Sequence, residues 1–149
     1  NMKFLIINGP NLNFLGIREK GVYGNETYAD LVKFIGERAN RLKIDIVILQ
    51  SNFEGEIIDF LQKAYYEELD GVIINPGAFT HYSYAIYDAI KSISIPTVEV
   101  HLSDIQSRED FRKVSVTAPA CIKQISGMGK EGYIEAIKFL KNILTKESV

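Results

Sequence analysis

The chain has one cysteine, two histidines and no long apolar run, and each shortage excludes a class of protein. Because Cys121 has no second cysteine to pair with, a reducing, cytoplasmic compartment is expected. The two histidines lack the spaced cysteines or carboxylates of a zinc site, so no metal is expected. The early apolar run at residues 4–7 is too short for a signal-peptide core or a membrane span, so no membrane contact is expected.

An excess of charge of one sign is also missing. The 17 basic and 19 acidic residues give a net charge of −2 and are mixed along the chain. A nucleic-acid binder would carry a basic stripe, so neither nucleic acid nor a membrane surface is an expected partner. Gly-x-Gly-x-x-Gly and Walker patterns do not follow the first apolar run, so no nucleotide cradle and no cofactor are expected.

What is present is an ordinary globular composition in 149 residues without a linker or repeat, which predicts a single catalytic domain over residues 1–149. Five apolar runs, at 3–8, 45–50, 71–75, 97–101 and 121–126, alternate with amphipathic segments at 27–41, 56–69, 82–93 and 133–144. The first amphipathic segment opens with Thr27 and Asp30, a variant of the capping box. Nearly continuous apolar runs are typical of parallel strands covered on both faces. The pattern predicts an α/β, flavodoxin-like three-layer sandwich whose five-stranded parallel sheet has the order 2-1-3-4-5.

In such a sheet, ligands bind beyond the carboxyl ends of the strands, where the strand order reverses. The segments to inspect therefore follow Asn8, Asn75 and His101. Two carry asparagines in tight turns, Asn8-Gly-Pro-Asn-Leu-Asn13 and Asn75-Pro-Gly, which bring amides close to a ligand. Both histidines, His81 and His101, also fall at these strand ends, which favours a site over two unrelated surface residues.

Charged residues near these strand ends suggest acid–base chemistry and anion binding. Glu99 and His101 are two apart on a strand, so they share a face and the carboxylate can orient the imidazole. A surface glutamate on an edge strand is the alternative, although Glu99 interrupts an apolar strand. Arg108 and Arg112 are four apart in a stretch predicted to open a short helix capped by Ser107. They form either an anion-binding face or a solvated one.

The loop at residues 12–25 is long for a strand-to-helix connection, which favours a lid or binding loop. It carries Arg18 and Tyr23. An adjacent cation lowers the pKa of a tyrosine from about 10 by roughly one to three units. Tyr23 is therefore a candidate general base.

Several motifs in one order and spacing make the chain resemble type II 3-dehydroquinate dehydratases of the shikimate pathway, nearly end to end. They are Asn-Gly-Pro-Asn-Leu-Asn-Phe-Leu-Gly-Ile-Arg at 8–18, Tyr-Gly at 23–24, Gln-Ser-Asn at 50–52, Glu-Gly at 54–55, Asn-Pro-Gly-Ala-Phe-Thr-His-Tyr-Ser at 75–83, Glu-Val-His-Leu-Ser at 99–103, Arg-Glu at 108–109 and Phe-Arg at 111–112. The resemblance implies dehydration of 3-dehydroquinate by anti elimination through an enolate, without metal or imine.

The resemblance also implies a role for each matching residue. In the reaction itself, Tyr23 would take the proton, Arg18 would support it, and His101, oriented by Glu99, would protonate the leaving hydroxyl; Asn13 is counted with this catalytic group. Substrate binding would involve Asn75 at the enolate oxygen, together with His81, Leu102, Ser103 and Arg112. Asp88 would reach a neighbouring subunit's site, in a dodecamer built from trimers.

Two functions from other classes share the predicted fold. A flavodoxin-like electron carrier would want a Ser/Thr-rich phosphate loop after the first strand, where Gly9-Pro10-Asn11 stands. A phospho-receiver domain would need acidic residues at the ends of the first and third strands, where Asn8 and Asn75 stand.

Overall fold

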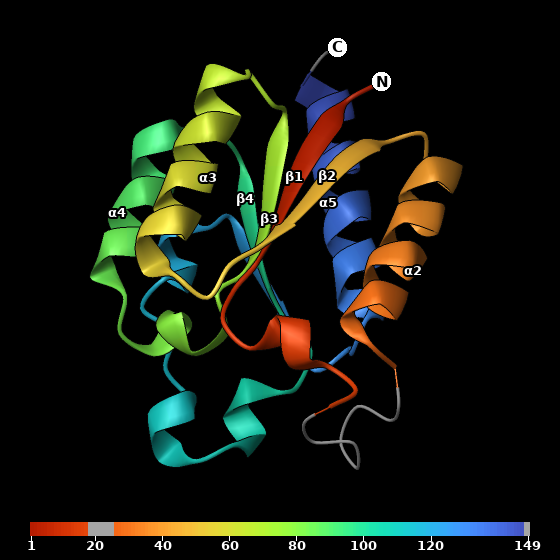
Figure 1. Cartoon of the computed structure of the whole chain (residues 1–149). Coiled ribbons are helices and arrows are strands. Elements are labelled where there is room, and N and C mark those ends of the chain that lie inside the picture. The colour runs from red at the N-terminus through yellow and green to blue at the C-terminus, as the bar shows by residue number, and fades with distance from the viewer. Residues whose placement is uncertain (18–25, 148–149) are drawn as a thin grey trace.

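Five strands form one parallel sheet in the order β2-β1-β3-β4-β5 (Figure 1). The computed structural model describes residues 1–17 and 26–147. The strands are β1 (Lys3–Asn8), β2 (Asp45–Gln50), β3 (Gly71–Asn75), β4 (Thr97–His101) and β5 (Lys123–Ser126). The predicted flavodoxin-like order is confirmed, and the bounds of the first four strands agree with those expected.

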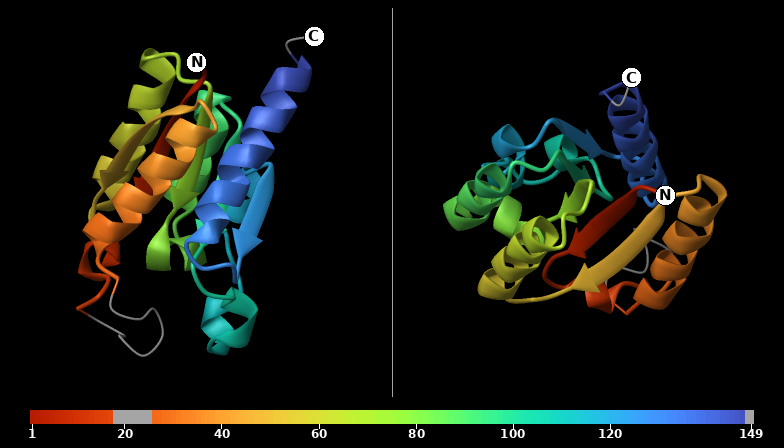
Figure 2. Two further views of the ribbon diagram at one scale, coloured as in Figure 1. Left: turned by 90° about the vertical axis from the view of Figure 1, so that its right-hand side faces the viewer. Right: turned by 90° about the horizontal axis from the view of Figure 1, so that it is seen from above.

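Two pairs of helices cover the two faces of the sheet, as the view from above in Figure 2 shows. On one face lie α2 (Tyr28–Arg41) and α5 (Glu131–Glu147), and on the other lie α3 (Glu54–Tyr66) and α4 (Tyr84–Ile93). The side chains of β1 alternate between two apolar clusters: Phe4 and Ile6 pack towards α2 and α5, whereas Leu5 and Ile7 pack towards α3 and α4. Burial on both faces explains why the strands read as unbroken apolar runs.

The helix ends follow local capping signals. Thr27 caps α2, and Thr27 and Asp30 exchange side-chain-to-backbone hydrogen bonds at 3.0 and 3.1 Å, so the predicted capping box is confirmed. Ser83 caps α4, which begins two residues later than predicted. Helix α3 ends at Tyr66 rather than at Leu69, because the chain turns into the left-handed region at Glu68 (φ 56°).

The last strand begins at Lys123, two residues later than predicted. A short 3-10 helix, η5 (Ala118–Ala120), precedes it, and the Cys121 amide closes this turn by donating to the Ala118 carbonyl at 2.9 Å. Cys121 packs against the apolar cluster under α3 and α4, as expected for a structural thiol, and burial raises the pKa of its side chain. No helix within residues 1–17 and 26–147 is long and apolar enough to cross a bilayer.

Strand register decides which polar residues meet at the carboxyl edge of the sheet. Asn8, at the end of β1, pairs with Gln50 on one side and with Asn75 on the other. Beyond this edge lie the short 3-10 helices η1 (Leu12–Phe14), η2 (Gly77–His81), η3 (Ile105–Ser107) and η4 (Asp110–Arg112). The loops after β1, β3 and β4 thus share one end of the molecule (Figures 1 and 2).

Candidate active site

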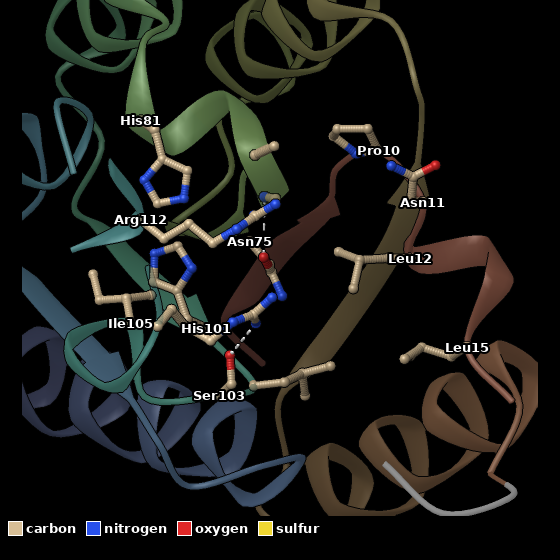
Figure 3. Close-up of a pocket in the computed structure, with 14 residues that line it drawn as sticks. Pro10, Asn11, Leu12, Leu15, Asn75, His81, His101, Ser103, Ile105 and Arg112 are labelled. Carbon is tan, nitrogen blue, oxygen red and sulfur yellow. Dashed lines mark hydrogen bonds between the residues drawn. The ribbon is translucent and has the colours of Figure 1, made fainter. Parts of the chain in front are cut away.

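A polar cavity of about 160 Å³ opens at the carboxyl ends of β1, β3 and β4, where the strand order reverses. Figure 3 shows Asn75, His81, His101, Ser103 and Arg112 around it, facing apolar side chains of the loop after β1. The location agrees with the rule for open α/β sheets. The sheet therefore brings both histidines to one cavity although 20 residues separate them in the chain.

The predicted Glu99–His101 pair is present and buried. The His101 Nε2 lies 2.8 Å from the Glu99 Oε2, and Glu99 has no exposed surface. Since a carboxylate only accepts hydrogen bonds, the hydrogen on this side of the ring sits on Nε2. Nδ1 is then the ring atom left to exchange a proton with a bound molecule. The alternative of a surface glutamate on an edge strand is wrong.

Glu99 is held by hydroxyl and amide donors that the sequence did not reveal. The Ser115 Oγ, Gln124 Nε2 and Thr80 Oγ1 donate to the Glu99 Oε2 at 2.8, 2.9 and 3.2 Å, and the Thr117 Oγ1 makes a short hydrogen bond to Oε1. The three hydroxyls also touch one another at 2.6–3.2 Å. These residues come from η2, the segment before η5, and β5, so no local spacing signals the cluster.

The donors around Glu99 decide its charge. Burial pushes the pKa of the carboxyl up, but the hydrogen bond and charge of His101 and the hydrogen bonds of Thr117 and Gln124 outweigh it, and the pKa is lowered. Glu99 is therefore a buried carboxylate in direct contact with the His101 ring.

The turn after β3 is tied to the turn after β1 by close backbone contact. The Gly9 amide donates to the Asn75 carbonyl at 2.7 Å, and a Cβ on Gly9 would lie 2.6 Å from the Pro76 oxygen. The Asn75 Oδ1 accepts from the Gly77 amide at 3.1 Å. Gly9 is thus required by the close approach of two strand ends.

The predicted short helix after Ser107 is wrong. Two separate 3-10 turns, η3 and η4, stand there, and Arg108 between them is extended. The Asp104 carboxylate caps η3 through the Gln106 amide at 2.9 Å, while the Gln106 side chain donates to the Lys113 carbonyl at 2.8 Å, which folds the segment back on itself.

Arg108 and Arg112 nevertheless both line the cavity, so the anion-binding interpretation is favoured over a solvated face. The Arg108 Nη1 donates to the Ser103 Oγ at 3.1 Å. The Arg112 Nε lies 2.8 Å from the Glu109 Oε2 but without the alignment of a hydrogen bond, and it has no hydrogen-bond partner in the described part of the chain. The Arg112 guanidinium also lies over the Phe111 ring, 4.8 Å from its centroid.

His81 is positioned by its backbone surroundings. Its Nδ1 lies 2.8 Å from the Val114 carbonyl, which can only accept, so Nδ1 carries the hydrogen. Its ring meets Phe111 edge-on at 6.3 Å. His81 therefore presents a fixed ring with Nε2 as its second polar atom.

The other predicted site residues are distributed unevenly. Leu102 and Ser103 line the cavity, and their carbonyls accept from the Gly129 and Gly127 amides, which fixes the backbone there. Asn13 lies on η1, accepts from the Gln50 side chain at 3.3 Å and does not line the cavity.

Of the three remaining predicted residues, the structure describes only Asp88. Asp88 is exposed on α4 and does not line it. Arg18 and Tyr23 lie outside the described residues, so their roles stay predictions. Among residues 1–17 and 26–147, no three His, Cys, Asp or Glu side chains are grouped so that they could hold a metal ion.

Comparisons with known proteins agree on one family. The family described as dehydroquinase class II matches residues 2–141. The chain is 63% identical to the 3-dehydroquinate dehydratase of Clostridium acetobutylicum, over 97% of this chain and all of that one. The crystal structure of type II dehydroquinase from Butyrivibrio crossotus is 56% identical, with a TM-score of 0.93 over 95% of this chain and 98% of that one. The type II dehydroquinase from Propionibacterium acnes is 36% identical, with a TM-score of 0.90 over 94% of this chain and 96% of that one.

Proposed function

The chain belongs to the dehydroquinase class II family, and from this premise we propose that it removes water from 3-dehydroquinate to give 3-dehydroshikimate in the shikimate pathway. The observation that carries the proposal is the buried Glu99–His101 pair in a polar cavity beside Asn75, Arg108 and Arg112. This reaction removes a proton from the carbon next to a ketone and then expels a hydroxyl. It needs a base for the proton, a hydrogen-bond donor that stabilises the enolate oxygen, and an acid that protonates the departing hydroxyl.

The first step is the removal of the proton next to the ketone. We assign it to Tyr23, with Arg18 lowering the tyrosine pKa and supporting the charge that develops, as the family resemblance implies. The electron pair of the C–H bond moves into the ketone to form an enolate. Asn75 lines the cavity and carries amide hydrogens, so it is the candidate donor to the enolate oxygen.

The second step expels the C1 hydroxyl on the opposite face. His101 gives its proton to this hydroxyl, the C–O bond breaks, water leaves, and the enolate collapses to the conjugated enone. Because the Nε2 of His101 points to Glu99, the proton comes from Nδ1. The Glu99 carboxylate stabilises the imidazolium before transfer, as the orienting carboxylate does in an acid–base pair.

Substrate recognition is assigned to the rest of the cavity. The Arg112 guanidinium lines the cavity and suits the carboxylate of the substrate, while its Nε is paired with the Glu109 carboxylate at 2.8 Å. His81 and the backbone amides of Leu102 and Ser103 are assigned to the hydroxyls and the carboxylate. Asp88 is assigned to the site of a neighbouring subunit, because it is exposed on α4 away from its own cavity. The reaction as proposed needs no metal, cofactor or lysine imine.

A cytoplasmic dodecamer built from trimers is proposed with this function. Tyr65, Tyr66, Tyr82 and Tyr84, on or beside α3 and α4, are all more than half exposed, which is unusual for large aromatic side chains and suits contacts between subunits. Sedimentation of the purified protein tests the assembly. A fully active monomer would remove both the dodecamer and the cross-subunit role of Asp88.

Product formation is tested by the rise in ultraviolet absorbance as 3-dehydroquinate becomes the conjugated enone. The division of labour is tested by exchange of the alpha hydrogen in heavy water, followed by NMR. Tyr23→Phe should make no product and exchange nothing above background. His101→Ala should still exchange while forming product roughly a hundredfold or more slowly. Exchange in Tyr23→Phe would assign the base to another residue, and loss of exchange in His101→Ala would place His101 before the enolate.

A further inference from the structure

A fully buried tyrosine, Tyr133, contacts Asn75, the candidate hydrogen-bond donor to the enolate oxygen, from within the protein core. Tyr133 lies in the first turn of α5, among the apolar residues that pack between α2, α5 and the sheet, and has no exposed surface. Its hydroxyl is nevertheless polar and reaches the carboxyl edge of the sheet. The Asn75 Nδ2 donates to the Tyr133 Oη at 3.0 Å, and the Tyr133 Oη donates to the Asn8 Oδ1 at 2.6 Å.

The hydrogen positions in this chain of contacts follow from donor chemistry. The Gly77 amide can only donate, so the atom of Asn75 that faces it at 3.1 Å is the oxygen, and Nδ2 is on the other side. The Tyr133 hydroxyl has one hydrogen. It goes to the Asn8 oxygen, because the Asn75 Nδ2 already donates to the hydroxyl lone pair. Burial raises the pKa of Tyr133, which keeps that hydrogen in place.

These contacts leave the Asn75 amide one orientation. If the amide turned over, its nitrogen would face the Gly77 amide, donor against donor. The Tyr133 hydroxyl would have to turn its hydrogen to Asn75 and leave the Asn8 oxygen without it. The contact of two donors at Gly77 disfavours the turned state, because a buried polar atom without a partner is costly. A turned Asn75 amide would also offer an oxygen lone pair, in place of an N–H, to the enolate oxygen.

We propose that Tyr133 is a positioning residue, which acts through Asn75 by holding the side-chain amide so that an N–H faces the oxygen of the enolate. This rests on the proposed function. Preorganised donors stabilise developing charge because they need no rearrangement during the reaction. The hydroxyl of Tyr133 supplies that preorganisation from the C-terminal helix, 58 residues away in the chain.

The ring of Tyr133 packs like that of any core residue, and only its hydroxyl has the proposed positioning role. Tyr133→Phe keeps the ring in the apolar cluster and removes the hydrogen bonds to Asn75 and Asn8. Tyr28→Phe is the matched control: the Tyr28 hydroxyl accepts from the Asn8 Nδ2 at 3.3 Å but is not bonded to Asn75. Both variants lose a tyrosine hydroxyl from one network, and only Tyr133→Phe frees the candidate donor.

The experiment measures kcat and KM for 3-dehydroquinate, alpha-hydrogen exchange in heavy water, and thermal unfolding. For Tyr133→Phe, kcat and exchange should fall together by about tenfold to hundredfold, below the roughly 10²–10³-fold cost of removing an oxyanion donor itself. KM should change little, because the donor matters most when the enolate forms. Tyr28→Phe should stay within about threefold of the parent.

A double-mutant cycle distinguishes positioning from a general loss of structure. In an Asn75→Ala background, Tyr133→Phe should have no further effect on kcat, because no amide remains to be held. Additive losses, or an unchanged kcat in Tyr133→Phe, would overturn the proposal. If Tyr133→Phe does not fold, Asn8→Ala removes the acceptor that fixes the Tyr133 hydrogen, so this hydroxyl can also donate to the oxygen of a turned Asn75 amide. A lower kcat at unchanged KM is then expected, and a parental kcat would overturn the proposal. A parent enzyme inactive on 3-dehydroquinate would instead refute the proposed function.

Discussion

Replacing Glu99 by Gln tests the central feature of the site with almost no change in shape. The Glu99 carboxylate accepts from His101 and from four further donors. A glutamine offers one acceptor oxygen in place of two. The variant should place its oxygen at the crowded Oε2 position and its nitrogen towards Thr117, whose hydroxyl can turn to accept. The packing then survives, and the negative charge is lost.

The expected loss of activity follows from the bond to His101. A hydrogen bond to a charged group contributes about 1.5–3 kcal/mol, against about 0.5–1.5 kcal/mol between neutral groups. The glutamine oxygen still accepts from His101, so the imidazolium loses only the difference, about 1–1.5 kcal/mol, and kcat falls about fivefold to tenfold. Because His101 acts after the enolate forms, alpha-hydrogen exchange should fall less than product formation.

The same substitution changes how stability depends on pH. The pKa of Glu99 is lowered on folding, mainly because the donors around it outweigh its burial. Its carboxylate therefore stabilises the fold above the unfolded carboxyl pKa of about 4.3, and this contribution is lost as the pH falls through the lowered folded pKa. At neutral pH, Glu99→Gln should lower the free energy of unfolding by about 1–3 kcal/mol. The difference from the parent should shrink as the pH falls below about 4.3.

Denaturant unfolding at neutral and acidic pH, together with kcat and exchange, checks these values. Glu131→Gln is the control, because the Glu131 ion pair with Arg38, at 3.1 Å, is solvent-exposed and should contribute within about 1 kcal/mol. A parental kcat in Glu99→Gln would refute the claim that the carboxylate charge supports the acid. A pH-independent stability difference would refute the lowered pKa.

Three more outcomes are expected. Gly9→Ala should lower the free energy of unfolding by about 1–3 kcal/mol, because the added Cβ meets the Pro76 backbone. Gly36→Ala, whose added Cβ has no atom within 4 Å, should raise the free energy of unfolding by about 0.5–1 kcal/mol. Equal effects on unfolding would refute the close approach at Gly9. Arg112→Ala should raise KM more than it lowers kcat, and steady-state kinetics with the reverse pattern would contradict its binding role. Activity should survive exhaustive chelation, and a loss of activity that a metal restores would contradict the proposed chemistry. Activity should also survive treatment with borohydride in the presence of substrate, and irreversible inactivation would indicate a lysine imine.

Most of the fold could be predicted because local sequence patterns specify its helices and strands. Apolar runs of strand length, the Thr27–Asp30 capping box and the alternation of elements depend on residues close in the chain. The same holds for the Glu99–His101 pair, since strand geometry alone puts residues two apart on one face. Where competing local options were close, as around Ser107, the prediction was wrong: the Asp104 cap and the Gln106–Lys113 hydrogen bond accompany two 3-10 turns in place of one helix.

The sequence by itself determined the strand order, the edge of the sheet where the site lies, and the identity of the side chains that end there. Only the tertiary structure decided what holds those side chains in place: the hydroxyl donors on Glu99 and the tyrosine behind Asn75. The reason is physical. A buried polar atom must find a partner wherever packing offers one, and packing joins residues as far apart as Asn8 and Tyr133, whose separation carries no periodic signal.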